Sequence, residues 1–208
     1  MLSIEPTPYN SFRIQASSNE ELASAFLRPQ EHYESPNDDF RTRPFTLGEY
    51  KHWYTKTRGA FTYYSDWTGF NIPSRILSSF LQGLFDPLTE QEQTLVDFFR
   101  YSSLDHPFYI IGANDDDVFK HELNHAFYTY SNDYQLSINS LFDSKLEYIK
   151  YALEYLLTKG YCRYMLYDEL QAYILDNDEE VVSLINDPST VAQVLSYHQH
   201  FEGKYHET

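Results

Sequence analysis

Residues 106–130 place a short apolar strand directly before a helix that begins with acidic residues, and this unit restricts the fold more than any other part of the chain. The segment HPFYIIGA (106–113) is β-branched and aromatic, and it ends at Gly112. Asn114 or Asp115 then offers a cap for a helix with an acidic first turn, as the helix dipole favours. We therefore expect a strand, a tight connection and a helix in immediate succession.

The chain before this unit mixes strands and helices, whereas the chain after it is almost wholly helical. Upstream, we expect a strand at 12–16, helices at 19–27, 46–57 and 74–85, a helix capped by Thr89, a β-rich segment at 60–64 and a loop at 66–73. Downstream, helical periodicity covers 132–142, 145–159, 163–175 and the C-terminal segment. This order predicts an α+β fold that is rich in helix.

The length and charge of the chain limit its organisation and its partners. The 208 residues suit a single domain, residues 1–208, with the proline-rich stretch 1–45 as a possible irregular N-terminal extension. The formal net charge of −16 argues against binding to nucleic acid or to an anionic membrane, since both require basic surfaces. A solvated acidic surface is the commoner meaning of such a charge, and a partner-binding surface is the alternative.

The cysteine count and the apolar runs favour a reducing compartment by default. Cys162 is the single cysteine, which excludes an intrachain disulfide and a cysteine-based zinc cage. The N-terminus has no secretory signal pattern, and no apolar run approaches the ~18 residues of a membrane span. We expect a cytoplasmic protein, although a protein exported without a signal would look the same. The sequence leaves the oligomeric state open.

The predicted helix after the strand carries the H-E-x-x-H pattern as His121, Glu122 and His125. Residues four apart share one helix face, so both imidazoles can reach a single ion. Zinc prefers such nitrogen ligands, and a catalytic site keeps one position for water. Glu122, beside the first histidine, is placed to act as the general base towards that water. The alternative to a metal site is that both histidines lie on a polar helix face in contact with solvent. The apolar residues of this helix indicate instead that the helix is buried.

The sequence KHELNHAFY after YIIGA resembles the zincin superfamily of metallopeptidases. This resemblance implies an edge strand above the active-site helix, with a peptide substrate added along residues 107–112. The metzincin branch needs a Gly and a third His soon after the second His, and AFYTYSND offers neither. A gluzincin instead takes a Glu from a later helix. Glu169 in YDELQAYIL, with Ala172 one turn on, resembles the third-ligand helix of minimal gluzincins, so the implied zinc ligands are His121, His125 and Glu169.

Several positions compete for roles around this centre. Glu147, Glu154 and Asp133 are alternative third ligands, although a solvent-exposed position or an immediate chain reversal counts against them. Larger gluzincins carry an Asp where this chain has Tyr173, so the group that orients His121 is open. The carboxylates that are candidates for that role are Asp168, Asp117 and Asp176.

For the aromatic and histidine residues outside the H-E-x-x-H motif, the sequence indicates a function less strongly. Tyr128, Tyr164 and Tyr173 are candidates for stabilising an oxyanion, but core packing is the commoner role of such residues. Trp53, Trp67 and GFNIP (69–73) fit a substrate cleft and an aromatic core equally well. His106 is expected in a loop, and the C-terminal histidines are expected at the surface. That C-terminal set comprises His198, His200 and His206.

These observations lead to two functional hypotheses. The first is a zinc-dependent hydrolase, specifically a metallopeptidase acting on a peptide or protein, in which Glu122 is the general base. The second is a catalytically inactive zincin-like protein that binds or regulates a partner through a structural metal or an acidic surface. The identity of the substrate does not follow from the sequence.

Overall fold

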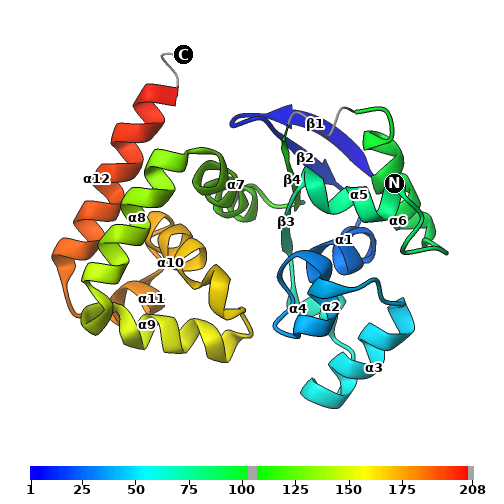
Figure 1. Cartoon of the computed structure of the whole chain (residues 1–208), viewed down its shortest axis with the longest axis horizontal. Helices are drawn as coiled ribbons and strands as arrows, with labels where there is room; N and C mark the ends of the chain where they lie inside the picture. Colours follow the sequence, from blue (N-terminus) through cyan, green and yellow to red (C-terminus); the bar gives the residue numbers. More distant parts are fainter. Residues whose placement is uncertain (103–106, 206–208) are drawn as a thin grey trace. The chain divides into compact units, whose positions relative to one another are not determined.

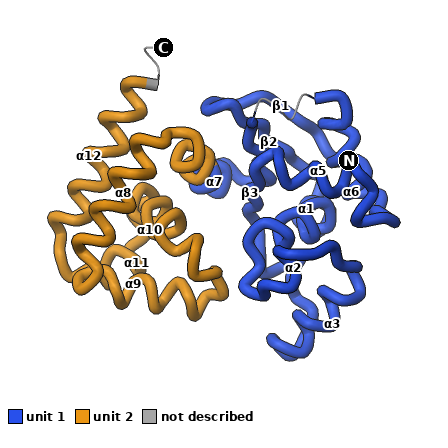
Figure 2. The backbone as a smooth tube through the Cα atoms, viewed as in Figure 1, with its two compact units in different colours: residues 1–122 blue, residues 123–208 orange. Residues whose placement is uncertain are grey.

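A computed structural model describes residues 1–102 and 107–205, so His106 and His206 lie outside the described residues. The chain forms two compact units, Met1–Glu122 and Leu123–Thr208 (Figure 2). The boundary between them falls inside helix α7 (Asp116–Tyr130), which therefore contributes to both. The single domain expected for residues 1–208 stays a prediction.

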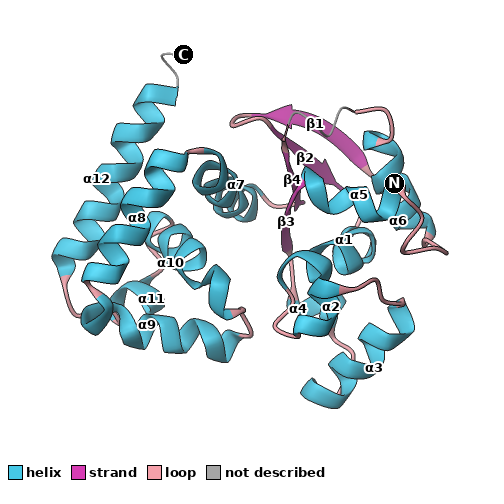
Figure 3. Ribbon diagram, viewed as in Figure 1, coloured by secondary structure: helices cyan, strands magenta, loops and turns pink. Residues whose placement is uncertain are grey.

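The first unit contains a four-stranded mixed sheet in the order β1-β2-β4-β3 (Figures 1 and 3). The strands are β1 (Ser3–Thr7), β2 (Ser11–Gln15), β3 (Gly69–Pro73) and β4 (Tyr109–Ala113). The β2–β4 pair is parallel, whereas β1 runs antiparallel to β2 and β3 antiparallel to β4. Together with the many helices, this sheet confirms the α+β class.

Helices make up most of both units. In the first unit they are α1 (Asn19–Glu34), α2 (Asp38–Thr42), α3 (Leu47–Arg58), α4 (Tyr63–Asp66), the 3₁₀ turn η1 (Ser74–Ile76), α5 (Leu77–Leu81) and α6 (Glu90–Phe99). In the second unit α7 is followed by α8 (Asn132–Ser144), α9 (Leu146–Lys159), the 3₁₀ turn η2 (Arg163–Met165), α10 (Leu166–Leu175), α11 (Glu179–Ser183) and α12 (Pro188–Tyr205). Within the described residues, no helix is both long enough and apolar enough to cross a membrane.

Two neighbouring segments, 60–64 and 69–73, differ in secondary structure from the sequence-based expectation, and the second changes the sheet. Residues 60–64 form no strand, because Tyr63 begins α4 and is buried in a cluster of aromatic rings. Residues 69–73, expected as a loop, form β3. A proline lacks the N–H that an interior strand needs, but Pro73 is tolerated here because β3 lies at the edge of the sheet.

The strand before α7 is therefore not the edge strand, and this part of the prediction is wrong. β4 has β2 on one side and β3 on the other, so both of its hydrogen-bonding edges are occupied. A peptide cannot be added along residues 107–112 while those pairs are formed. The edge strand next to β4 is β3.

Residues 1–45, expected as a possible irregular extension, are instead largely regular, and β2 and α1 contribute buried side chains. They supply β1, β2, α1 and α2, and α1 carries the central core residues Leu22 and Phe26. Phe26 stacks on Phe70 of β3 with ring centroids 5.4 Å apart. It also lies against Gly112 of β4, where an added Cβ would stand 2.7 Å from its ring. This stretch is thus an integral part of the first unit.

Candidate metal centre

Helix α7 begins where the sequence predicted, and its cap is Asp115. The Asp115 carboxylate accepts hydrogen bonds from the backbone N–H groups of Asp117 and Val118 at 2.8 and 3.2 Å. These backbone hydrogen bonds hold the pKa of the Asp115 carboxyl below its ordinary value. Asp116 forms an ion pair with Arg13 of β2 at 2.8 Å, which ties the first turn of α7 to the sheet.

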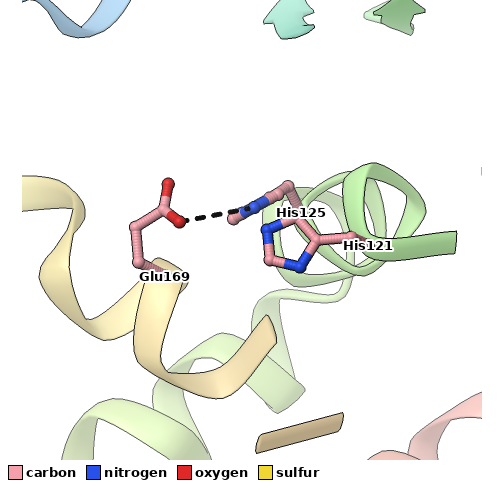
Figure 4. Close-up of side chains that lie close together, drawn as sticks. All are labelled: His121, His125 and Glu169. Atoms are coloured by element: carbon pink, nitrogen blue, oxygen red, sulfur yellow. Dashed lines mark ion pairs between the residues drawn. The ribbon is translucent and has the colours of Figure 1, made fainter. Parts of the chain in front are cut away.

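One face of α7 and the first turns of α10 bring together two imidazoles and a carboxylate. His121 and His125 lie one turn apart on α7, and Glu169 points towards them from α10 (Figure 4). One ligand atom of each residue lies within 4.8 Å of the other two. His125 and Glu169 are buried, whereas His121 is partly exposed. The two histidines come from the H-E-x-x-H pattern, and Glu169 is the third ligand that the resemblance implied.

The buried imidazole of His125 is held from both sides by carboxylates of α10. Its Nδ1 lies 2.8 Å from Asp168 Oδ1, and its Nε2 lies 3.8 Å from Glu169 Oε2. The Asp168 contact fixes the ring so that Nε2 faces Glu169. Asp168 had been a candidate for orienting His121, but the structure places it beside His125.

The remaining two candidates for orienting His121 have other partners. Asp117 is exposed and forms an ion pair with Lys120 at 2.7 Å. Asp176, which follows α10, accepts a hydrogen bond of 3.3 Å from Asn124. Asp168 therefore positions His125, whereas the expectation that Asp117 or Asp176 orients His121 stays a prediction.

The donor set and its spacing fit a divalent zinc ion. Two imidazole nitrogens and a carboxylate oxygen are ligands that zinc takes in catalytic sites. Tetrahedral bonds of about 2.0–2.1 Å put ligand atoms roughly 3.3 Å apart, so small side-chain rotations would bring His125 and Glu169 from 3.8 Å to that spacing. A zinc ion would also place a cation beside the buried carboxylate of Glu169.

Glu122 is buried and is held against the edge strand β3. Asn71 Nδ2 donates to Glu122 Oε2 at 2.5 Å, and the Tyr109 hydroxyl donates to Asn71 Oδ1 at 2.7 Å. At Gly69 an added Cβ would stand 2.0 Å from Glu122 Oε1, so the carboxylate lies directly on the backbone of β3. Gly69 and Asn71 belong to GFNIP, which fitted a substrate cleft or an aromatic core, and no contact of Asn71, Tyr109 or Gly69 with Glu122 was expected. The available signal was GFNIP, in which a polar residue alternates with Phe70 and Ile72.

The outward-facing backbone edge of β3 is in contact with α1. Ser74 N donates to Phe108 O at 2.8 Å, so Phe70 and Ile72 direct their backbone groups towards β4, as alternate residues do. The N–H of Asn71 therefore points away from β4. It donates to Gln30 Oε1 of α1 at 2.9 Å, and both residues are buried.

The three competing carboxylates are exposed, and two of the three candidate tyrosines make hydroxyl contacts with other side chains. Glu147 and Glu154 of α9 and Asp133 of α8 are all exposed, as the sequence indicated. Tyr128 is buried and its hydroxyl donates to Asn139 at 2.6 Å, which is a packing role. The hydroxyls of Tyr161 and Tyr173 lie 2.9 Å apart, and Tyr164 is exposed.

The histidines and tryptophans outside the centre belong mostly to the packing of their units. His198 was expected at the surface, but it is half-buried because its ring packs on Phe127 and Tyr134. That burial lowers its pKa below the ordinary value. His200 is exposed, as expected. Trp53 packs in an aromatic cluster with Phe40 and Tyr50, and Trp67 packs on Tyr63.

Comparison with protein-family models, with curated proteins and with solved structures finds no match for this chain. A function for this chain is therefore inferred from its own side chains.

Proposed function

We propose that this protein is a zinc-dependent hydrolase, most simply a metallopeptidase of the minimal gluzincin type with a zincin-like fold. The observation that carries the proposal is the convergence of His121, His125 and Glu169 within 4.8 Å, with the buried carboxylate of Glu122 next in sequence to the first ligand. Four residues from two helices thus supply three zinc ligands and one base, which is the complement that such a hydrolase needs.

Each residue has a separate task in this proposal. His121, His125 and Glu169 hold the zinc, and Asp168 keeps the His125 ring in the orientation that presents Nε2. When bound, zinc activates water and polarises the substrate carbonyl. Glu122 accepts a proton from the attacking water and returns it to the leaving amine. An amide is the substrate class that makes use of both proton transfers.

A peptide substrate is proposed to approach β3, since β4 is an interior strand. Strand addition uses backbone hydrogen bonds and therefore tolerates many side chains. The Asn71 N–H is one donor that such a substrate would use, and Gln30 Oε1 already accepts from it. The side-chain carbonyl of Gln30 thus occupies the place of a substrate carbonyl, and binding would require its displacement.

This Gln30 contact also favours the second candidate, a zincin-like binding or regulatory protein with a structural metal. In that case β3 would stay capped by α1, and no peptide would be cleaved. The exchange Gln30→Ala separates the two candidates. It should raise the rate of peptide cleavage in a peptidase, and it should have no such effect in a protein that lacks the activity.

Metal analysis and one substitution test the proposed function. Protein purified without added metal should contain about one zinc per chain, measured by inductively coupled plasma mass spectrometry. Glu122→Gln should retain the zinc and lose cleavage of a mixed peptide library by at least about a hundredfold. Glu154→Gln, an exposed change of the same type on α9, is the matched control and should keep full activity. Full cleavage by the Glu122→Gln protein would reject the mechanism.

A further inference from the structure

We infer that Asn71 is the positioning residue of Glu122, and that Tyr109 fixes the side-chain amide of Asn71 in the orientation this task requires. The inference rests on the proposed function, because positioning matters for catalysis only if Glu122 acts as a base. The contacts themselves lie within the first unit and join β3 and β4 to the start of α7.

The orientation of the Asn71 amide follows from the donors around it. An asparagine amide has one accepting and one donating end, and a neighbouring group must decide which end points where. The Tyr109 hydroxyl donates to Oδ1 at 2.7 Å, which places Nδ2 towards Glu122. An ionised carboxylate only accepts hydrogen bonds, so the donating end is the one that it requires.

The position of Glu122 is limited on its other side by the backbone. Gly69 lies two residues before Asn71 on the same face of β3, and any Cβ there would collide with Glu122 Oε1. The carboxylate therefore lies between a donor and a bare stretch of backbone. One of its oxygens, Oε2, is engaged by Asn71, and the other faces Gly69.

The burial of the network makes the arrangement specific. Asn71, Tyr109 and Glu122 are 4%, 0% and 6% exposed, so water cannot replace the missing partner if one of them is changed. A general base must be held within hydrogen-bond reach of the proton that it takes, and small displacements reduce the rate strongly. Asn71 thus acts through Glu122, and it is not proposed to touch the substrate with its side chain.

The substitution Asn71→Asp tests the inference most sharply, because it keeps the shape of the side chain and replaces its donor by an acceptor. We expect kcat to fall by about tenfold to a hundredfold while KM stays within about threefold and the zinc content is unchanged. Tyr109→Phe removes only the hydroxyl, so it should show a smaller loss of the same kind. An unchanged kcat in Asn71→Asp, or an effect confined to KM, would overturn the inference.

Asn139→Asp is the matched control. Asn139 also accepts a hydrogen bond from a tyrosine hydroxyl, but the donor is Tyr128. It should leave kcat unchanged. A similar loss in this control would assign the Asn71 effect to general disturbance and would also count against the inference.

A spectroscopic measurement separates this inference from the proposed function. In protein labelled with ¹⁵N, the side-chain amide signal of Asn71 should shift on Glu122→Gln and should not shift on Glu154→Gln. This shift establishes the contact between Asn71 and Glu122 even if the protein cleaves no peptide. In that case the proposed function is rejected, and the contact still stands. An Asn71 signal that is the same in the wild type and in Glu122→Gln would overturn the positioning role.

Discussion

His125 and Asp168 share a hydrogen bond of 2.8 Å between Nδ1 and Oδ1, and both side chains are buried. The carboxylate accepts the Nδ1 proton, so the lone pair of Nε2 faces Glu169. Adjacent residues of α10 therefore contact opposite nitrogens of one ring. The side chain that orients the ligand and the side chain that would share the metal come from a single helical turn.

This relationship predicts a loss of metal affinity in Asp168→Asn. The neutral amide binds the Nδ1 proton more weakly and lowers the basicity of the ring, so zinc affinity should fall by about tenfold to a hundredfold. Competition with a chromophoric chelator measures it. Asp39→Asn, at an exposed carboxylate of α2, should keep the wild-type affinity. Equal affinities in the two variants would argue against the role of Asp168.

Zinc should stabilise the fold through Glu169. A ligand at a hundred times its dissociation constant adds about 2.7 kcal/mol to the free energy of unfolding, and chelation should remove that gain. In Glu169→Gln most of this response should disappear, whereas Glu147→Gln on the exposed face of α9 should retain it. Thermal unfolding with and without zinc measures the difference. A full zinc response in Glu169→Gln would exclude this residue as a ligand.

Gly69→Ala should damage the site without removing any polar group. The new Cβ would stand 2.0 Å from Glu122 Oε1 and 2.8 Å from Val118 Cγ1, so the carboxylate must move. We expect a loss of about 1–3 kcal/mol in the free energy of unfolding and a lower kcat. Gly48→Ala in α3, where nothing lies closer than 3.9 Å, should be neutral or stabilising by up to about 1 kcal/mol. Urea unfolding and peptide cleavage assays on both variants check this.

The buried carboxyl of Glu31 predicts a fall in stability as the pH rises. Burial raises its pKa to about 7 from the ordinary value of 4.5, although the hydroxyls of Tyr50 and Tyr63, Ser35 and the charge of Arg58 oppose the shift. Between these two values the unfolded chain loses the proton while the folded chain keeps it. The contribution of Glu31 to stability is thus largest below about pH 4.5 and declines up to about pH 7, by on the order of 3 kcal/mol.

Glu31→Gln removes this titration and provides the comparison. The difference in the free energy of unfolding between wild type and variant should shift in favour of the variant from pH 5 to pH 7.5, measured by urea unfolding. A difference that is the same at both pH values would show that Glu31 titrates alike in the folded and unfolded chain.

The shared helix face of the two histidines was predictable because its information is local. The spacing of His121 and His125 places them on one face of any helix that contains them, whatever surrounds it. Thr46 with Glu49 and Thr89 with Glu92 form the capping boxes that their spacing predicts. Glu169 was found by resemblance to a known arrangement, since no periodicity connects it to a helix so much earlier in the chain.

Only the tertiary structure decided the edge of the sheet and the surroundings of Glu122. Strand order depends on pairing between distant segments, so nothing local in GFNIP shows that it pairs with β4 and leaves β4 in the interior. Likewise, Asp168 has the same spacing to His125 whether or not the two meet. The sequence by itself determined which helix carries the two histidines and which types of donor atom that helix offers. Long-range packing determined that Asp168 contacts His125 and that β3 lies beside Glu122, because these contacts join residues that are far apart in the sequence.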